Sequence, residues 1–154
     1  MTKKIVITLI ITTFATICTV AQNPLNNAAD NIVGTYSGDL DGDKFRAKIT
    51  KLADGSYRGQ IIWVENDCDA QGNKRLDTKN PDKKLRSVSC DRIVLFNGLR
   101  YDAKEREWSG TKIYDPTRGI RAKLVASWTR DGQLRLKCSV MGISKNLYWQ
   151  QIEK

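Results

Sequence analysis

A regular alternation of apolar and polar residues in the second half of the chain most constrains its fold. Every second residue is apolar between residues 120 and 129, and the same pattern returns between residues 134 and 141. A period of two is typical of a β-strand with one buried face, because successive side chains point to opposite faces of a sheet. Asp131-Gly132 separates the two runs and favours a tight hairpin turn. We therefore predict two neighbouring antiparallel strands here.

The same pattern extends over most of the chain. The predicted strands are residues 32–38, 45–50, 56–65, 92–96, 99–102, 108–114, 120–129, 134–141 and 146–152. About eight short strands with tight turns, and no amphipathic helix of any length, predict an all-β protein. Consecutive hairpins favour an antiparallel up-and-down barrel, because closure removes exposed sheet edges. A barrel of about eight strands is just wide enough to be filled by side chains or to hold one small ligand.

The central strand of the chain ends abruptly. Trp108, Ile113 and Tyr114 suit a pleated, half-buried surface. Asp115-Pro116 then stops the strand, because proline has no N–H and restricts the residue before it. Gly119 closes the turn that follows. We expect the Asp115 side chain to cap this turn.

The N-terminus predicts export. Two lysines precede an apolar run over residues 5–17, and Thr19-Val20-Ala21 is a plausible small-residue cleavage site. This order is typical of a secretory signal peptide, here residues 1–21. Residues 22–31 are polar and Asn-rich, so we expect a flexible lead-in to a single domain over residues 32–154. The predicted location is periplasmic or extracellular; a lipoprotein anchored at Cys18 is the alternative, disfavoured by the bulky residue before it.

Composition excludes several kinds of function. The chain has no histidine, which rules out His general acids and bases, His-dependent triads and His metal ligands. Loss of the signal peptide would lower the formal net charge from +9 to +7. An exported basic protein can meet anionic lipid, glycan or a negatively charged partner, although solubility alone also accounts for such a charge. Nucleic acid does not fit that compartment, and no stretch after the leader predicts a transmembrane segment.

Residues 66–91 interrupt the strand pattern with charged and turn-forming residues. A loop this long is usually functional or disordered, and Pro81 favours a helical turn near residues 81–86. Cys68 and Cys90 bracket the loop, and in an exported protein we expect them to form a disulfide worth on the order of 3 kcal/mol, with two separate thiols as the alternative. Its basic residues predict either a solvated loop or an anion-binding rim: Lys74, Arg75, Lys79, Lys83, Lys84 and Arg86.

Several motifs together resemble a known family. They are Gly34 with Tyr36, Ile62 with Trp63, Asp77 with Asn80-Pro81, the block 108–116 ending in Ile-Tyr-Asp-Pro, Gly119, and a late Trp149. Over nearly the whole exported chain, these motifs resemble the domain of unknown function 2147 family of secreted bacterial proteins. Thr111 and Cys138 depart from the family pattern, which has glycine at these points. The resemblance implies a barrel similar to those of the lipocalin and avidin group, whose members mostly bind small apolar or amphipathic ligands.

The aromatic residues supply candidates for a ligand wall. In the third predicted strand, Trp63 shares one face with Tyr57, Gly59 and Ile61. Most such aromatics are expected in the core. If one end of the barrel is open, Trp63, Trp108 and Tyr114 would line it and stack on a ligand ring or sugar.

The polar candidates are Asp77, Asn80 and Asp115. Asp115 and the basic loop would orient the polar end of a ligand, with Asp77 and Asn80 beside them. The favoured interpretation of all three is structural, because Asp and Asn side chains cap turns. Cys138 shares a strand face with Leu134 and is expected to be a buried apolar residue rather than a reactive thiol.

The sequence thus predicts a non-catalytic, exported β-barrel that binds a small amphipathic or lipid-like ligand. The alternative is an envelope interaction module that recognises an acidic glycan, a lipid or a protein through residues 66–91. A third possibility is a hydrolase that uses Asp77 and Asp115, which requires their carboxyl groups to lie within about 10 Å in a cleft. No cofactor or metal is predicted, because the oxygen ligands around Asp67 and Asp69 lack EF-hand spacing.

Overall fold

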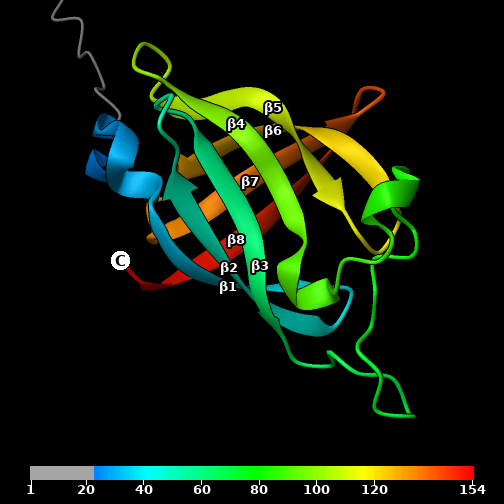
Figure 1. Cartoon of the computed structure of the whole chain (residues 1–154). Coiled ribbons are helices and arrows are strands. Elements are labelled where there is room, and N and C mark those ends of the chain that lie inside the picture. Colours follow the sequence, from blue (N-terminus) through cyan, green and yellow to red (C-terminus); the bar gives the residue numbers. More distant parts are fainter. Residues whose placement is uncertain (1–22) are drawn as a thin grey trace, which may run out of the picture.

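The protein forms a closed barrel of eight antiparallel strands (Figure 1). A computed structural model describes residues 23–154, so the predicted signal peptide lies outside the described residues. Each strand pairs with the next, and β8 returns to pair with β1. The strands are β1 (Gly34–Leu40), β2 (Asp43–Lys51), β3 (Tyr57–Val64), β4 (Val94–Asp102), β5 (Glu107–Asp115), β6 (Ile120–Trp128), β7 (Gln133–Val140) and β8 (Ile143–Glu153). The predicted all-β, up-and-down barrel is confirmed.

One predicted break in the strands is wrong. The sequence predicts separate strands at residues 92–96 and 99–102, but β4 runs without interruption from Val94 to Asp102. Gly98 has a φ of 78°, and the pairing of β3 with β4 shifts register at this point. Asn97-Gly98 therefore forms a β-bulge rather than a hairpin turn. Both structures use a glycine with positive φ, so the dipeptide alone does not distinguish them.

A second bulge changes which side chains of β3 face the interior. The pairing of β2 with β3 shifts between Ile61 and Trp63, which leaves Ile62 as an extra residue. One extra residue reverses the two faces of the strand beyond it, so Val64 packs against the core in place of Trp63. Trp63 is 41% exposed and lies under the guanidinium of Arg46, 5.2 Å from the ring centroid. The predicted inner position of Trp63 is wrong.

The N-terminal segment covers one end of the barrel, in the place where the sequence predicts a flexible lead-in (Figure 1). It forms two 3₁₀ turns, η1 (Pro24–Asn27) and η2 (Ala29–Ile32). The Asn26 side chain donates to the carbonyl of Trp128 at 3.0 Å and accepts from its backbone N–H at 2.7 Å. The indole N–H of Trp108 donates to the carbonyl of Ala29 at 2.8 Å. Side-chain amides thus bind this polar segment to the barrel, and its last residue, Ile32, is fully buried.

The half of the barrel next to these turns is packed with side chains. Leu124, Leu134 and Leu136 are fully buried, because they occupy inward positions of the paired strands β6 and β7. Aromatic rings continue this core toward the middle of the barrel. Trp149 lies 6.0 Å from Tyr36 and 5.5 Å from Phe45, measured between ring centroids.

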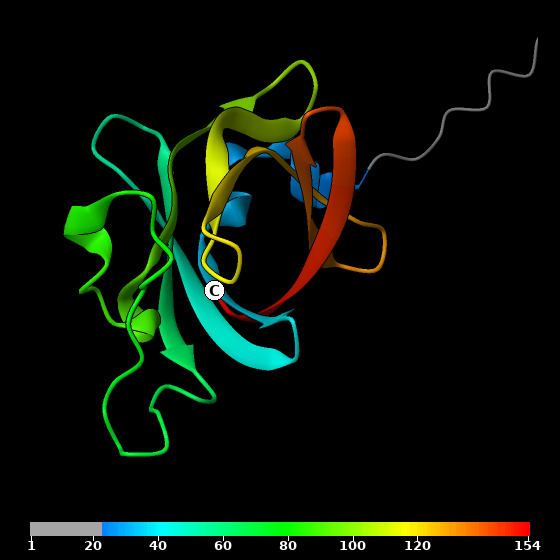
Figure 2. The ribbon, with the colours of Figure 1, turned by 90° about the vertical axis from the view of Figure 1, so that its right-hand side faces the viewer.

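The opposite end is open, and Figure 2 looks into it. It is formed by the β1–β2, β5–β6 and β7–β8 turns and by the long loop between β3 and β4. This loop contains η3 (Lys83–Leu85), which confirms the predicted helical turn, and η4 (Cys90–Arg92). None of the helices formed by residues 23–154 has the length and apolar character needed to span a membrane.

The predicted Cys68–Cys90 disulfide is not formed, and both thiols are free. The segment that carries Arg75 lies between the two cysteines. The backbone N–H of Arg75 donates to Asp67 on one side, and its carbonyl accepts from Cys90 on the other. Sequence spacing shows that two cysteines bracket a loop, but the chain between them decides whether they can meet.

Candidate functional site

The open half of the barrel contains a cavity of about 470 Å³. Phe45 and Trp149 line it and also contact the packed half, so their rings form its floor. The walls are apolar and come from β4 to β8: Leu95, Ile113, Ile120, Ala122, Cys138, Val140, Ile143 and Leu147. Its charged residues belong to the rim: Asp39, Asp41, Asp115, Arg118 and Lys145. This combination of volume, apolar walls and few polar groups is typical of small-molecule sites.

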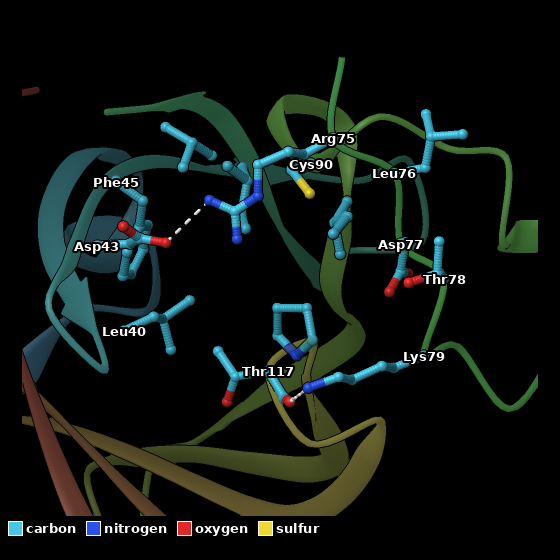
Figure 3. Close-up of a pocket in the computed structure, with 14 residues that line it drawn as sticks. Leu40, Asp43, Phe45, Arg75, Leu76, Asp77, Thr78, Lys79, Cys90 and Thr117 are labelled. Carbon is cyan, nitrogen blue, oxygen red and sulfur yellow. Dashed lines mark hydrogen bonds and ion pairs between the residues drawn. The ribbon is translucent and has the colours of Figure 1, made fainter. Parts of the chain in front are cut away.

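A second cavity of about 390 Å³ lies between the barrel mouth and the long loop (Figure 3). Arg75 of the loop forms an ion pair with Asp43 of β2 at 3.1 Å, and Lys79 donates to the carbonyl of Thr117 at 2.6 Å. These contacts bridge the loop to the rim on two sides. Leu40 and Phe45 line both cavities, so the two adjoin at the β1–β2 hairpin.

A buried polar network holds the loop against β5. The Tyr114 hydroxyl donates to Asp77 Oδ1 at 2.7 Å, and the Asn80 side-chain amide donates to Asp77 Oδ2 at 2.6 Å. Only 4% of Asp77 and 2% of Asn80 are exposed. Burial, together with the hydrogen bond to Asp77, raises the pKa of Tyr114 above its ordinary value. Both carboxylate oxygens of Asp77 thus have a structural partner, as the turn-forming interpretation predicts.

The β5–β6 turn packs directly on the backbone of the loop. Gly119 has a φ of 68°, and a Cβ atom at this position would lie 2.3 Å from the carbonyl oxygen of Lys79. Only glycine fits there without displacing the loop. The residue before the Asn-Pro motif and the turn after the Asp-Pro motif, far apart in sequence, are therefore in contact in the fold.

Asp115 caps the β5–β6 turn, as predicted. Its Oδ1 accepts from the backbone N–H of Thr117 at 2.9 Å and from the Thr117 hydroxyl at 2.7 Å. Arg118 binds Asp115 at 2.9 Å and Asp41 at 3.3 Å. Burial alone would raise the pKa of Asp115, but the hydrogen bonds from Thr117 and Arg118 outweigh it and hold the pKa below its ordinary value. The carboxylate therefore stays ionised at the rim.

Two of the three aromatic residues predicted to line the open end of the barrel lie away from it. Trp63 lies on the outer surface and Trp108 under the N-terminal turns, and neither lines either of the two cavities described above. Tyr114 reaches the edge of the larger cavity, but its hydroxyl binds the loop. The residues that do form the floor are Phe45 and Trp149. Alternation places both on inner faces, but only the closure of one end shows which inner residues remain uncovered.

The basic residues of the loop are largely engaged within the molecule. Lys74 forms ion pairs with Asp67 and Asp91, and Arg86 donates to the carbonyl of Asn80 at 2.8 Å. Arg75 and Lys79 form the two bridges to the rim. These contacts weaken the alternative of an anion-binding loop, since four of its six predicted cations already have partners.

The two candidate hydrolytic carboxylates are not arranged as a catalytic pair. Asp77 is buried with both oxygens bonded, and Asp115 caps a turn. Within residues 23–154, no group of three or more Cys, Asp and Glu side chains is placed to hold a metal ion. The arrangement is that of an apolar container with a charged rim.

Comparisons with known proteins found a matching family and a solved structure of similar fold. The family model of domain of unknown function 2147, described as an uncharacterized protein conserved in bacteria, matches residues 34–151. The chain belongs to this family. A search of curated proteins found no match. Among solved structures, the fold is similar to protein HP1028 of the human pathogen Helicobacter pylori, described as belonging to the lipocalin family, with a TM-score of 0.61 and 23% identity. The similarity covers 78% of this chain and 82% of that one, and it shows a common fold.

Proposed function

We propose that this member of the family is an exported protein that binds a small amphipathic molecule, with the apolar part of the ligand in the barrel. The observation that carries the proposal is the apolar cavity of about 470 Å³, open at one end of a barrel whose other half is packed. A cavity that already has its shape in the free protein binds a ligand without the free-energy cost of ordering side chains or loops first. Export rests on the signal-peptide pattern of residues 1–21.

A rim cation that is unpaired among the described residues supports an anionic polar group on the ligand. Arg118 forms ion pairs with Asp115 and Asp41, and Asp39, which forms no ion pair within residues 23–154, accepts from the backbone N–H of Gly42. Lys145 is the rim cation that forms no ion pair with any residue in 23–154. An anionic group, such as the carboxylate of a fatty acid, would complete the charge balance of Lys145.

The wall beneath Lys145 stays neutral at physiological pH. Cys138 is the cross-strand partner of Lys145 and lines the cavity. Burial raises the pKa of the Cys138 thiol to about 11. The thiol therefore remains protonated and acts as part of the apolar surface on which a hydrocarbon chain packs.

A fluorescent fatty acid, cis-parinaric acid, tests the proposal through its emission on binding. Ala122 lines the cavity and Lys123 points outward from the same strand, so the two positions give a matched pair. Ala122→Phe fills the cavity and should weaken binding at least tenfold, whereas Lys123→Phe should leave it unchanged. Circular dichroism shows whether each variant is folded. Absence of saturable binding by the wild-type protein, or equal binding by a folded Ala122→Phe variant, would overturn the proposal for this ligand class.

Native mass spectrometry of protein purified from its own host provides an independent test. An additional mass that organic extraction removes would identify the natural ligand. The protein mass itself shows whether residues 1–21 have been removed, and a lipid attached at Cys18 would identify the lipoprotein alternative.

A further inference from the structure

One side of the barrel mouth carries a protruding group of apolar side chains. We call Ile120, Val140, Met141 and Ile143 the apolar lip. Met141 is 98% exposed and Ile143 79% exposed, at the turn between β7 and β8. Figure 2 shows this hairpin at the edge of the ring of strands. Soluble proteins seldom expose several large apolar side chains together unless the surface binds something.

The backbone conformation of the β7–β8 turn makes methionine an unusual residue at position 141. Met141 has a φ of 48° and Gly142 a φ of 83°, so both central residues of the hairpin turn are left-handed. Asn and Gly favour such positions, and methionine adopts them at a cost in backbone energy. Met141 makes no buried contact that offsets this cost, because it is almost fully exposed. The side chain is placed where it can insert into something outside the barrel.

The strands that carry the lip form a basic wall without acidic residues near the mouth. Between residues 119 and 152 the single acidic residue is Asp131, which lies in the β6–β7 turn at the closed end. The same stretch places three cations on the outer face of the strands near the mouth, Arg121, Lys123 and Lys137, and a fourth, Lys145, at the rim of the cavity. Among residues 23–154, none of these four has an ion-pair partner. Of the acidic rim residues, Asp39 and Asp41 belong to β1 and its turn, whereas Asp115 ends β5 opposite Ile120 and forms an ion pair with Arg118.

We propose that this side of the mouth docks on an anionic lipid surface, with Met141 and Ile143 inserted among the headgroups and the basic wall facing the lipid charge. Protruding apolar side chains flanked by uncompensated cations suit a membrane interface, where one part meets acyl chains and the other meets phosphate. All four lip residues also line the larger cavity. Docking would therefore bring the cavity mouth to the bilayer, so a lipid-like ligand could transfer without crossing water. The transfer step rests on the proposed function, whereas docking rests on this surface alone.

Cosedimentation with vesicles tests docking. The exported protein, with its mass verified, is mixed with vesicles of phosphatidylcholine alone or with one part phosphatidylglycerol to three parts phosphatidylcholine. Binding is expected to the mixed vesicles and to be far weaker to phosphatidylcholine alone. Met141→Asn together with Ile143→Thr should lower the partition coefficient about tenfold or more. Asparagine suits a left-handed turn position, so this variant removes apolar surface without weakening the hairpin.

The charge contribution is tested separately. Lys123→Gln together with Lys137→Gln should lower binding roughly fivefold per residue at low salt, and salt should reduce the difference. Matched controls place the same changes on other surfaces: Ile62→Thr with Ile152→Thr, and Lys48→Gln with Lys104→Gln. Both control pairs should bind as the wild type does.

Failure of wild-type binding to the mixed vesicles, or full binding by the lip variant, would overturn the inference. So would an equal loss in the control pairs, because that would show attraction by overall charge or hydrophobicity. The cis-parinaric acid assay without vesicles reports the cavity by itself. A protein that binds this probe but not vesicles would retain the proposed function and lose the docking surface.

Discussion

The hydrogen bond between Tyr114 and Asp77 should decide how often the long loop leaves the barrel. Tyr114→Phe removes the hydroxyl that donates to Asp77 Oδ1 at 2.7 Å and keeps the ring. Asp77 is 4% exposed, so its oxygen would lose a donor that water cannot easily replace while the loop is docked. Hydrogen bonds to charged groups contribute about 1.5–3 kcal/mol. We therefore expect the docked loop to be destabilised by about 2 kcal/mol.

That free energy corresponds to an increase of about thirtyfold in the open population of the loop, since about 1.4 kcal/mol is a factor of ten. Trypsin is a direct probe, because Lys83 and Lys84 lie in the loop and become fully accessible when it opens. When opening is fast relative to cleavage, the cleavage rate follows the open population. Cleavage in the loop should therefore accelerate about thirtyfold in the variant.

Tyr148→Phe is the matched control. Tyr148 is 50% exposed and lies on β8, so loss of its hydroxyl should leave trypsin cleavage of the loop unchanged. A change of less than about threefold for Tyr114→Phe would refute the reasoning. It would mean that the Tyr114 hydroxyl contributes little to docking, and that Arg75 and Lys79 suffice to hold the loop.

Three further predictions follow from contacts at the open end. Gly119→Ala should destabilise the protein by about 2 kcal/mol or more in urea unfolding, because the new Cβ would lie 2.3 Å from the Lys79 carbonyl oxygen. Gly132→Ala is the control: this position has a φ of 76° and open space around it, so the variant should lose only the roughly 1–2 kcal/mol of left-handed backbone strain. Equal losses in the two variants would contradict the clash. Cys138 should react with iodoacetamide at neutral pH roughly two orders of magnitude more slowly than an ordinary thiol, because burial raises its pKa to about 11. The reaction should accelerate as the pH rises toward 11. Rapid labelling of Cys138 at neutral pH, measured by mass spectrometry, would contradict this. The pKa of Asp115 is lowered in the folded state, so its contribution to the free energy of unfolding is present above its unfolded pKa of about 3.9 and is lost as pH falls through the folded value. Asp115→Asn should therefore flatten the acid side of the curve of unfolding free energy against pH. An unchanged slope would argue against the turn cap.

The candidate site could be predicted from the sequence only in part. Asp77, Asn80 and Tyr114 emerged from local motifs, and the structure brings all three into one network. The motif does not say whether such a network faces a ligand or fastens a loop. Burial decides, because the Asp77 carboxylate is bonded inside the protein and only 4% of the residue is exposed, which leaves a ligand no access to it.

The floor of the cavity could not be predicted in the same way. Phe45 and Trp149 lie on inner faces by alternation, as Trp108 does, yet Trp108 lies beneath the N-terminal turns. Periodicity reports the face of a strand and carries no information on height along the barrel axis. The packing of residues 24–32 on one end therefore separates core from cavity, and no local pattern in that polar segment indicates it.

The sequence by itself indicated an antiparallel meander of about eight strands, because a period of two and the turn signals between most consecutive strands are local properties of the chain. It also determined the Asp115 cap, whose donors lie within three residues. The tertiary structure alone decided that Trp63 faces outward, that Cys68 and Cys90 remain apart, and that the apolar lip stands beside the cavity mouth. Each of these depends on a register or a packing contact between segments far apart in sequence, where one extra residue in a strand is enough to exchange inside for outside.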